Sequence, residues 1–370
     1  MLVLRMVLSL VLALALALAA PASGSVEDAP PPLLQAMAYV HPKADPVSVD
    51  FVDWAQLKRL YGHEGITSAS PLAERQRFML EVARNESLPV PLGLDRLATW
   101  PEAWGWDNTD LDWQARYWDG RNVLRFGEHW DPAPFRAALE SFGYQRNASG
   151  GIEGWQPPEA RMPTDLRLEL MRGEIEGPET SHTYAPVTID SAERTVVIHD
   201  IGPALPPKSL RRAARSDLER IADTPAVRAA IALGDVIAAT VAASPEYLCR
   251  WPHEDMLAED PEVSAVVDGL RRYQARADGY ARSGAGAPAT VRYAFSYKRP
   301  RQARADLEAR SALVELGTPW SSPAGEVALL DARVEGKELI LDVEPLHGHP
   351  GPYTGWRYVW APFASCGPSR

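Results

Sequence analysis

The chain has 370 residues, of which 46% are hydrophobic and 24% charged, so it can form one large or two ordinary globular domains. Its formal net charge of −11 argues against nucleic acid and anionic membranes as partners, because both favour a basic surface. The arginine clusters at 209–220 and 297–310 alternate with acidic residues at helical spacing, which is typical of solvated helix faces.

Residues 1–22 have the organisation of a secretory signal peptide. Arg5 precedes an apolar run from Val7 to Ala20, and Ala20-Pro21-Ala22 supplies small residues for cleavage. We expect cleavage after Ala22 and a secreted or extracytoplasmic protein. The alternative is an uncleaved anchor, but the run is shorter than the roughly 20 residues that a spanning helix needs. No later segment is apolar and long enough to span a membrane.

The two cysteines, Cys249 and Cys366, are even in number in a chain that we expect to be exported. This combination favours a disulfide that ties the C-terminal tail to the middle of the chain. In the chain-entropy model, closing so long a loop stabilises the fold by about 4–5 kcal/mol. The alternative is two buried thiols. A redox or metal role is disfavoured because the chain has no C-x-x-C.

Residues 23–46 are rich in proline and predict a flexible leader, with order beginning near Val47. Residues 47–121 predict a helical, tryptophan-rich region. Its first helix takes Asp50 as cap and ends at Gly62. A second helix over 70–84 has a serine cap followed by proline in the first turn.

Residues 122–250 predict a first α+β unit. It contains a strand at 122–130, a short helix that starts at Asp131-Pro132, a strand at 151–155 and a hairpin that turns at Ser191-Ala192. Helices are expected at 206–222 and 225–233. Periodicity leaves 236–243 open between a buried strand and a helix.

Residues 251–287 predict a long helix at about 261–277 and a Gly/Ala-rich link that is a plausible domain boundary. Residues 288–370 predict a second α+β unit: a strand, a helix ending at Gly317, a hairpin turning at Glu335-Gly336, and the tethered tail. The order strand, helix, strand, strand occurs in both units. The predicted fold class is therefore α+β, with an N-terminal helical region followed by two ferredoxin-like units.

The stretch "WDNTDLDWQARYWDG" at 106–120 carries the candidate ligand-binding residues. Asp107, Asp110 and Asp112 are spaced i, i+3, i+5 among aromatic residues whose rings can stack on sugars. The candidate set is Trp104, Trp106, Asp107, Asp110, Asp112 and Trp113, with Trp118 as a further aromatic residue. The alternative is structural: acids favour a helix N-terminus, and Trp113 and Tyr117 would pack one helical turn apart.

The spacing Asp107-x-x-Asp110-x-Asp112-x-Gln114 resembles the D-x-x-D-x-D-x-E signature of the chitinase-like glycoside hydrolases. In that family the last acid protonates the leaving oxygen, and here Gln114 cannot do so. The resemblance therefore implies an inactive, sugar-binding relative. It covers about eight residues, and the family's β/α barrel does not match the order of elements expected here. A calcium site at Asn108, Asp110 and Asp112 lacks the usual glycine and glutamate.

The order of "WPEAWGWDNTDLDWQ", "DPAPFRAALESFGY", "DLEARSALVELG" and "ARVEGKELILDVEP" resembles a group of uncharacterised exported bacterial proteins over most of the mature chain. The resemblance implies no catalytic residue. The chain also lacks G-x-S-x-G, H-E-x-x-H and a phosphate loop, and the pair His347 and His349 lacks a third metal ligand.

The sequence predicts a non-catalytic exported protein of the cell envelope or medium. It would bind an unknown ligand or envelope component, with no cofactor and no metal. The alternatives are a glycan-binding or glycan-hydrolysing protein and a structural envelope protein.

Overall fold

The computed structural model describes residues 30–40, 47–86, 97–149, 151–157, 185–199, 221–243, 261–316 and 327–345. The predicted signal peptide, the Cys249–Cys366 disulfide, the tail and the pair His347 and His349 lie outside the described residues.

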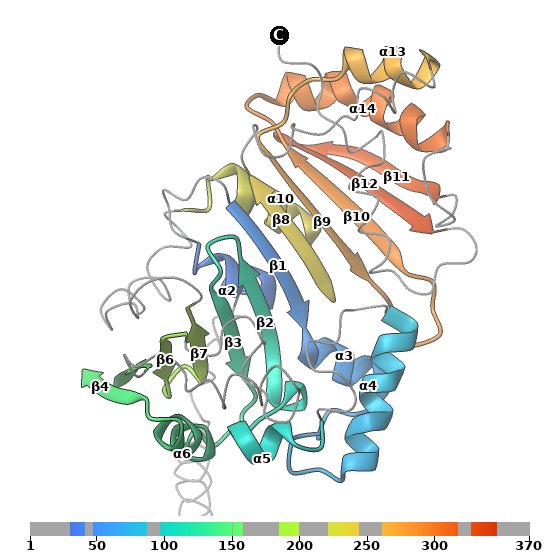
Figure 1. The fold of residues 1–370 in the computed structure, drawn as a ribbon. Coiled ribbons are helices and arrows are strands. Elements are labelled where there is room, and N and C mark those ends of the chain that lie inside the picture. The colour runs from blue at the N-terminus through green and yellow to red at the C-terminus, as the bar shows by residue number, and fades with distance from the viewer. Residues whose placement is uncertain are drawn as a thin grey trace, which may run out of the picture. The chain divides into compact units, whose positions relative to one another are not determined.

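The described strands form one antiparallel sheet in the order β11-β12-β10-β9-β8-β1-β2-β3-β7-β6-β5-β4 (Figure 1). The N-terminal half contains α2 (Pro32–Met37), β1 (Val47–Asp53), α3 (Trp54–Tyr61), α4 (Leu72–Glu86), α5 (Trp100–Trp104), the 3-10 helix η1 (Asn108–Asp110), β2 (Leu111–Tyr117), β3 (Asn122–Phe126), α6 (Ala133–Ser141), β4 (Gln145–Ser149), β5 (Ile152–Gln156), β6 (Val187–Asp190) and β7 (Thr195–Ile198). The C-terminal half contains α10 (Pro225–Leu233), β8 (Ala238–Ala243), α13 (Pro261–Gly269), β9 (Ala275–Ala281), β10 (Thr290–Ser296), α14 (Pro300–Glu315), β11 (Val327–Glu335) and β12 (Glu338–Pro345).

The two halves repeat one topology. In each, a helix (α2 or α10) precedes a central strand (β1 or β8). Helical segments (α3, α4, α5 and η1 in the first half, and α13 among the described residues of the second) then lead to two paired strands, β2–β3 or β9–β10. A crossing helix (α6 or α14) and a hairpin (β6–β7 or β11–β12) complete the repeat. The order β1-β2-β3-β7-β6 in one half corresponds to β8-β9-β10-β12-β11 in the other, and the N-terminal half adds β4 and β5 at its edge. Since β1 pairs with β8, the repeats meet at the centre of the sheet.

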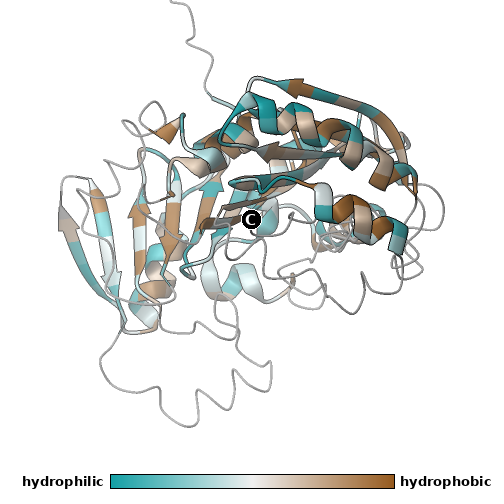
Figure 2. Ribbon diagram, turned by 90° about the horizontal axis from the view of Figure 1, so that it is seen from above, coloured by the Kyte–Doolittle hydropathy of each residue, from teal (hydrophilic) through white to brown (hydrophobic). Residues whose placement is uncertain are grey.

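Each face of the sheet has its own hydrophobic core. On one face, apolar residues of α3, α4, α5, α6, α13 and α14 pack on the strands. On the other face, α2 and α10 pack on the central strands and contact each other. Strand residues alternate between the two cores; for example, Phe51 packs with α2 and α10, while Val52 packs on the opposite side. Figure 2 shows hydrophobic and hydrophilic residues mixed along the strands.

The α+β class is confirmed, but the N-terminal helical region and the two ferredoxin-like units are not. Residues 47–53 form a central strand instead of the start of a helix, and Asp53 rather than Asp50 caps α3. The Asp53 carboxylate accepts a hydrogen bond from Gln56 N at 2.7 Å, and Gly62 ends the helix with φ of 71°. Order also begins earlier than predicted, because Leu33, Ala36 and Met37 of α2 are buried.

Two further boundaries differ from the prediction. The helix expected at 261–277 ends at Gly269, and its last third forms β9, which pairs with β8 and β10. The Gly/Ala-rich link joins β9 to β10 as a hairpin connection inside the sheet, so it does not separate domains in the structure. The segment 236–243, left open by periodicity, forms β8.

Among the described residues, no helix combines the length and hydrophobicity required to cross a membrane.

Candidate functional site

The tryptophans of the predicted binding stretch are packed inside the protein. The exposed fractions of Trp104, Trp106 and Trp113 are 2%, 5% and 3%. Trp104 stacks on Phe142 with ring centroids 4.6 Å apart. Trp113 lies in the opposite core, 6.3 Å from the ring of Phe51. Their burial favours a structural role, and the ligand-binding role stays a prediction. Trp118, which is 55% exposed, is the member of the stretch that faces solvent.

Asp107 and Asp110 form the ends of a capping box around η1. Asp107 Oδ1 accepts a hydrogen bond from Thr109 N at 2.7 Å, and Asp110 Oδ2 accepts one from Asp107 N at 2.9 Å. Arg75 of α4 pairs with Asp107 Oδ2 at 2.5 Å, and Ser68 N donates to Asp110 Oδ1 at 2.9 Å. Burial raises the pKa of Asp110, and the backbone hydrogen bonds oppose that rise. Both carboxylates therefore hold the chain before β2 in place.

Asp112 differs from its two neighbours. It is the second residue of β2, which is a strand rather than the helix considered from the sequence, and it is only partly buried. Within the described residues its carboxylate accepts no hydrogen bond. Gly127 lies beside it, so that a Cβ at Gly127 would be 3.3 Å from Asp112 Oδ1. Asp112 is thus brought to the same end of the sheet as Asp107 and Asp110 without sharing their capping role.

A second group of polar side chains crosses the centre of the sheet where the two repeats meet. The strand register aligns Arg116 of β2, Asp50 of β1, Thr240 of β8 and Asp278 of β9 in one row. At about 4.8 Å per strand, the row is about 14 Å long. Thr240 Oγ1 donates to Asp50 Oδ1 at 2.8 Å. We call these four residues the central row.

The central row lies on the sheet face that carries α3–α6 and α13–α14. Its neighbour on β10, Tyr293, is part of that core. Asp50 and Arg116 are nevertheless exposed, so the core is interrupted by accessible charge at the junction of the repeats. Such polar residues at the middle of a sheet do not contribute to an apolar core, and this makes the central row a candidate binding surface.

The C-terminal end of the row is anchored by a buried ion pair. Arg276 Nε lies 3.0 Å from Asp278 Oδ1, and the two residues are 4% and 2% exposed. Burial raises the pKa of Asp278, while the Arg276 guanidinium opposes this by favouring the carboxylate. The pair fixes one end of the row, and Asp50 and Arg116 present one charge of each sign at the accessible end.

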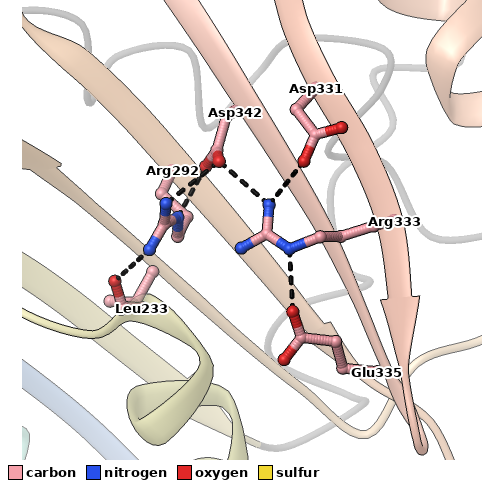
Figure 3. A network of polar contacts seen from close by, with 6 residues as sticks. All are labelled: Leu233, Arg292, Asp331, Arg333, Glu335 and Asp342. Carbon is pink, nitrogen blue, oxygen red and sulfur yellow. Dashed lines mark hydrogen bonds and ion pairs between the residues drawn. The ribbon is translucent and has the colours of Figure 1, made fainter.

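A third charged group lies on β10, β11 and β12 (Figure 3). Asp342 Oδ1 accepts from Arg292 Nε at 2.6 Å, and Arg333 Nη1 lies 3.0 Å from Asp342 Oδ2. Arg333 also pairs with Asp331 and Glu335, each at 2.8 Å. Burial alone would raise the pKa of Asp342, but the hydrogen bonds from both arginines outweigh it and lower the pKa. Because every labelled charge has a partner, this network is a paired sheet surface rather than a site.

Within the described part of the chain, no group of three or more His, Cys, Asp or Glu side chains is arranged to hold a metal ion. The sequence prediction missed the central row because its members come from four distant segments and only the strand register aligns them.

Comparisons with protein-family models, curated proteins and solved structures found no match for this chain.

Proposed function

We propose that the protein is an exported, non-catalytic binding protein of the bacterial cell envelope or medium, and that its ligand binds along the central row. The observation that supports this proposal is the accessible pair Asp50 and Arg116 at the junction of the repeats. The signal-like N-terminus, the resemblance to exported bacterial proteins and the absence of a complete catalytic motif in the sequence are consistent with it.

The row fits a ligand that carries both charges or both hydrogen-bonding functions. Arg116 offers a planar donor group that suits a carboxylate, and Asp50 and Thr240 offer acceptors that suit an ammonium or amide group. Peptides with free amino and carboxyl groups have this chemistry, and the stem peptides of peptidoglycan are an envelope component that carries it. A neutral sugar polymer such as chitin does not need the charges.

The test is retention of the mature protein on insoluble peptidoglycan and, separately, on chitin. We expect retention on peptidoglycan, weakened at least fivefold by Asp50→Asn combined with Arg116→Gln. Arg304→Gln combined with Glu308→Gln is the matched control, because it removes the same two charges from the exposed face of α14. That control should bind as the parent protein does.

Two outcomes contradict the proposal. One is no retention on peptidoglycan, and the other is retention that the central-row variant leaves unchanged. Retention on chitin that is lost in Trp118→Ala would instead support the glycan-binding alternative, since Trp118 is the exposed aromatic residue of the predicted stretch.

For the fold, we propose that the two repeats arose by duplication of one α+β unit. The matching order of elements and strands supports this. Membership of each unit in the ferredoxin-like class stays a prediction.

A further inference from the structure

Trp118 directly follows β2 and lies on the same face of the sheet as the central row. Trp118 N donates to Ser48 O at 2.9 Å, so the pairing of β2 with β1 continues one residue past Tyr117. Arg116 and Trp118 are exposed, whereas Tyr117 between them is buried in the core of the opposite face. This alternation is that of a continuing strand, and it places Trp118 about 7 Å from Arg116 along the accessible face.

Four side chains form a rectangle at this end of the central row. Arg116 and Trp118 supply one side from β2, and Asp50 and Ser48 supply the other from β1. Asp50 is directly opposite Arg116 in the register, and Ser48 is opposite Trp118. Directly opposite residues are about 5 Å apart, and diagonal neighbours such as Trp118 and Asp50 are about 7–8 Å apart, which an aromatic side chain can span. We call these four residues the Trp118 rectangle.

The Trp118 rectangle combines an aromatic ring with three hydrogen-bonding groups on accessible surface. Trp118 is 55% exposed, Asp50 and Arg116 are exposed, and Ser48 is partly exposed. Single exposed apolar side chains are common on protein surfaces. The other large apolar residues that are exposed in the described part of the chain are aliphatic: Leu72, Ile231, Leu316 and Leu330. Trp118 differs from them because it is aromatic and lies beside charged groups of both signs.

A sugar ring matches this combination of groups. One face of a pyranose ring carries C–H groups that stack on an indole, and the hydroxyl and amide groups at its rim need hydrogen-bond donors and acceptors. Arg116 and Asp50 lie at the distance of such a rim, and the same two residues begin the central row. A ring on Trp118 would therefore place any charged group attached to the ring over the central row.

We propose that Trp118 stacks on a sugar ring of a muropeptide while the central row binds the stem peptide attached to that ring. This inference rests on the proposed function and narrows its ligand to a molecule that contains both parts. In peptidoglycan a short lactyl group joins the stem peptide to a sugar ring, so the ring and the first peptide groups are neighbours. The central row, about 14 Å long, has the length of about four extended residues.

The test is isothermal titration calorimetry of the mature protein with three probes. They are the disaccharide-tetrapeptide that a muramidase releases from peptidoglycan, the same tetrapeptide without sugar, and the disaccharide without peptide. We expect the disaccharide-tetrapeptide to bind roughly tenfold more tightly than the tetrapeptide, which is the effect expected of one aromatic contact. The disaccharide should bind roughly 100-fold more weakly than the disaccharide-tetrapeptide, because it does not use the charges of the central row.

Substitution of Trp118 should affect the sugar and not the peptide. Trp118→Ala should bind the disaccharide-tetrapeptide only as tightly as the tetrapeptide, and its unchanged affinity for the tetrapeptide shows that it is folded. Trp118→Phe keeps a ring and should retain most of the difference. Asp50→Asn combined with Arg116→Gln should weaken both peptide-containing probes. Leu330→Ala is the matched control, because it removes a 52% exposed apolar side chain from β11, and it should change none of the affinities.

The outcomes separate this inference from the proposed function. Equal affinity of the parent protein for the disaccharide-tetrapeptide and the tetrapeptide overturns the inference and leaves the proposed function standing. The same holds for a loss in Trp118→Ala that is equal for both probes, since a structural role would produce it. If neither peptide-containing probe binds, the proposed function fails and the inference fails with it. Binding of the disaccharide as tightly as the disaccharide-tetrapeptide contradicts both and favours the glycan-binding alternative.

Discussion

Asp53 is 4% exposed, and burial raises its pKa from 3.8 to about 6, opposed by the hydrogen bond from Gln56 N. Between these two values the folded state holds a proton that the unfolded chain releases. Protonation of Asp53 therefore stabilises the fold at low pH, and this contribution is lost as the pH rises through 6. Asp53→Asn keeps a good capping residue and removes the titration.

We expect Asp53→Asn to be more stable than the parent above pH 6, by at most about 3 kcal/mol, and to lose that advantage near pH 4. Urea unfolding at several pH values between 4 and 8 measures it. A constant difference across this range would contradict the assignment.

His199, which directly follows β7, changes the stability with pH in the opposite direction to Asp53. It is 3% exposed, and burial together with the charge of Arg121 lowers its pKa from 6.5 to about 4. The unfolded chain takes up a proton at higher pH than the folded chain. The stability from neutral His199 is therefore complete above pH 6.5 and lost as the pH falls toward 4.

His199→Gln should flatten this part of the pH profile, by at most about 3 kcal/mol between pH 6.5 and 4. The same urea series measures it. An unchanged slope would show that another group carries the acid sensitivity. Gln is chosen because its amide group has both a donor and an acceptor for Thr188 Oγ1, which lies 3.3 Å from His199 Nε2.

At the scale of elements, Gly105 controls how closely α5 approaches α6. It has φ of 74°, and a Cβ there would lie 2.5 Å from Pro134 Cβ and 2.7 Å from the Pro134 carbonyl carbon. Gly105→Ala should thus cost more than the about 1 kcal/mol of left-handed strain alone, reaching about 3 kcal/mol. Gly62→Ala is the control, because Gly62 has φ of 71° with nothing within 4 Å. Equal losses in thermal and urea unfolding would argue against the steric contribution.

Most elements were predictable because their signals are local. α6 begins at Ala133, directly after the predicted start at Asp131-Pro132, although Pro132 rather than Asp131 is its N-cap residue. The turns between β6 and β7 and between β11 and β12 lie where turn residues indicated. The prediction for residues 47–53 was wrong because Asp50 and Asp53 both fit a helix cap, while the alternation of apolar and polar residues in the segment also fits a strand. Pairing with β2 and β8 selects the strand conformation. Residues 275–281 contain no β-branched residue, and two neighbouring strands impose the strand conformation.

At the scale of the molecule, the candidate sites depend on contacts that no local pattern encodes. Asp107 and Asp110 were found from the sequence, but their contacts with Arg75 and with Ser68 N come from segments 32 and 42 residues away along the chain. The central row needs the register of four strands from both repeats, so its alignment became visible only in the sheet. Sequence reasoning therefore identified chemically notable residues better than it identified their neighbours.

The repeats should unfold as one cooperative unit. Both hydrophobic cores contain residues from each half, and buried Glu86 of α4 lies 3.5 Å from Arg282, which follows β9. Separating the repeats would expose these contacts and the β1–β8 pairing together. A substitution that destabilises one repeat should thus lower the free energy of unfolding of the other repeat by the same amount.

Gly279→Ala in β9 tests this, because its Cβ would lie 2.8 Å from Ala238 O. A loss of about 2 kcal/mol should accelerate hydrogen exchange of the slowest amides about 30-fold, in β2 and β3 of the other repeat as much as in β10 and β12. Gly269→Ala, with nothing within 4 Å, is the control and should leave exchange in both repeats unchanged. Acceleration confined to residues 225–345 would show two independently unfolding units, and the continuous sheet would then join domains that fold separately.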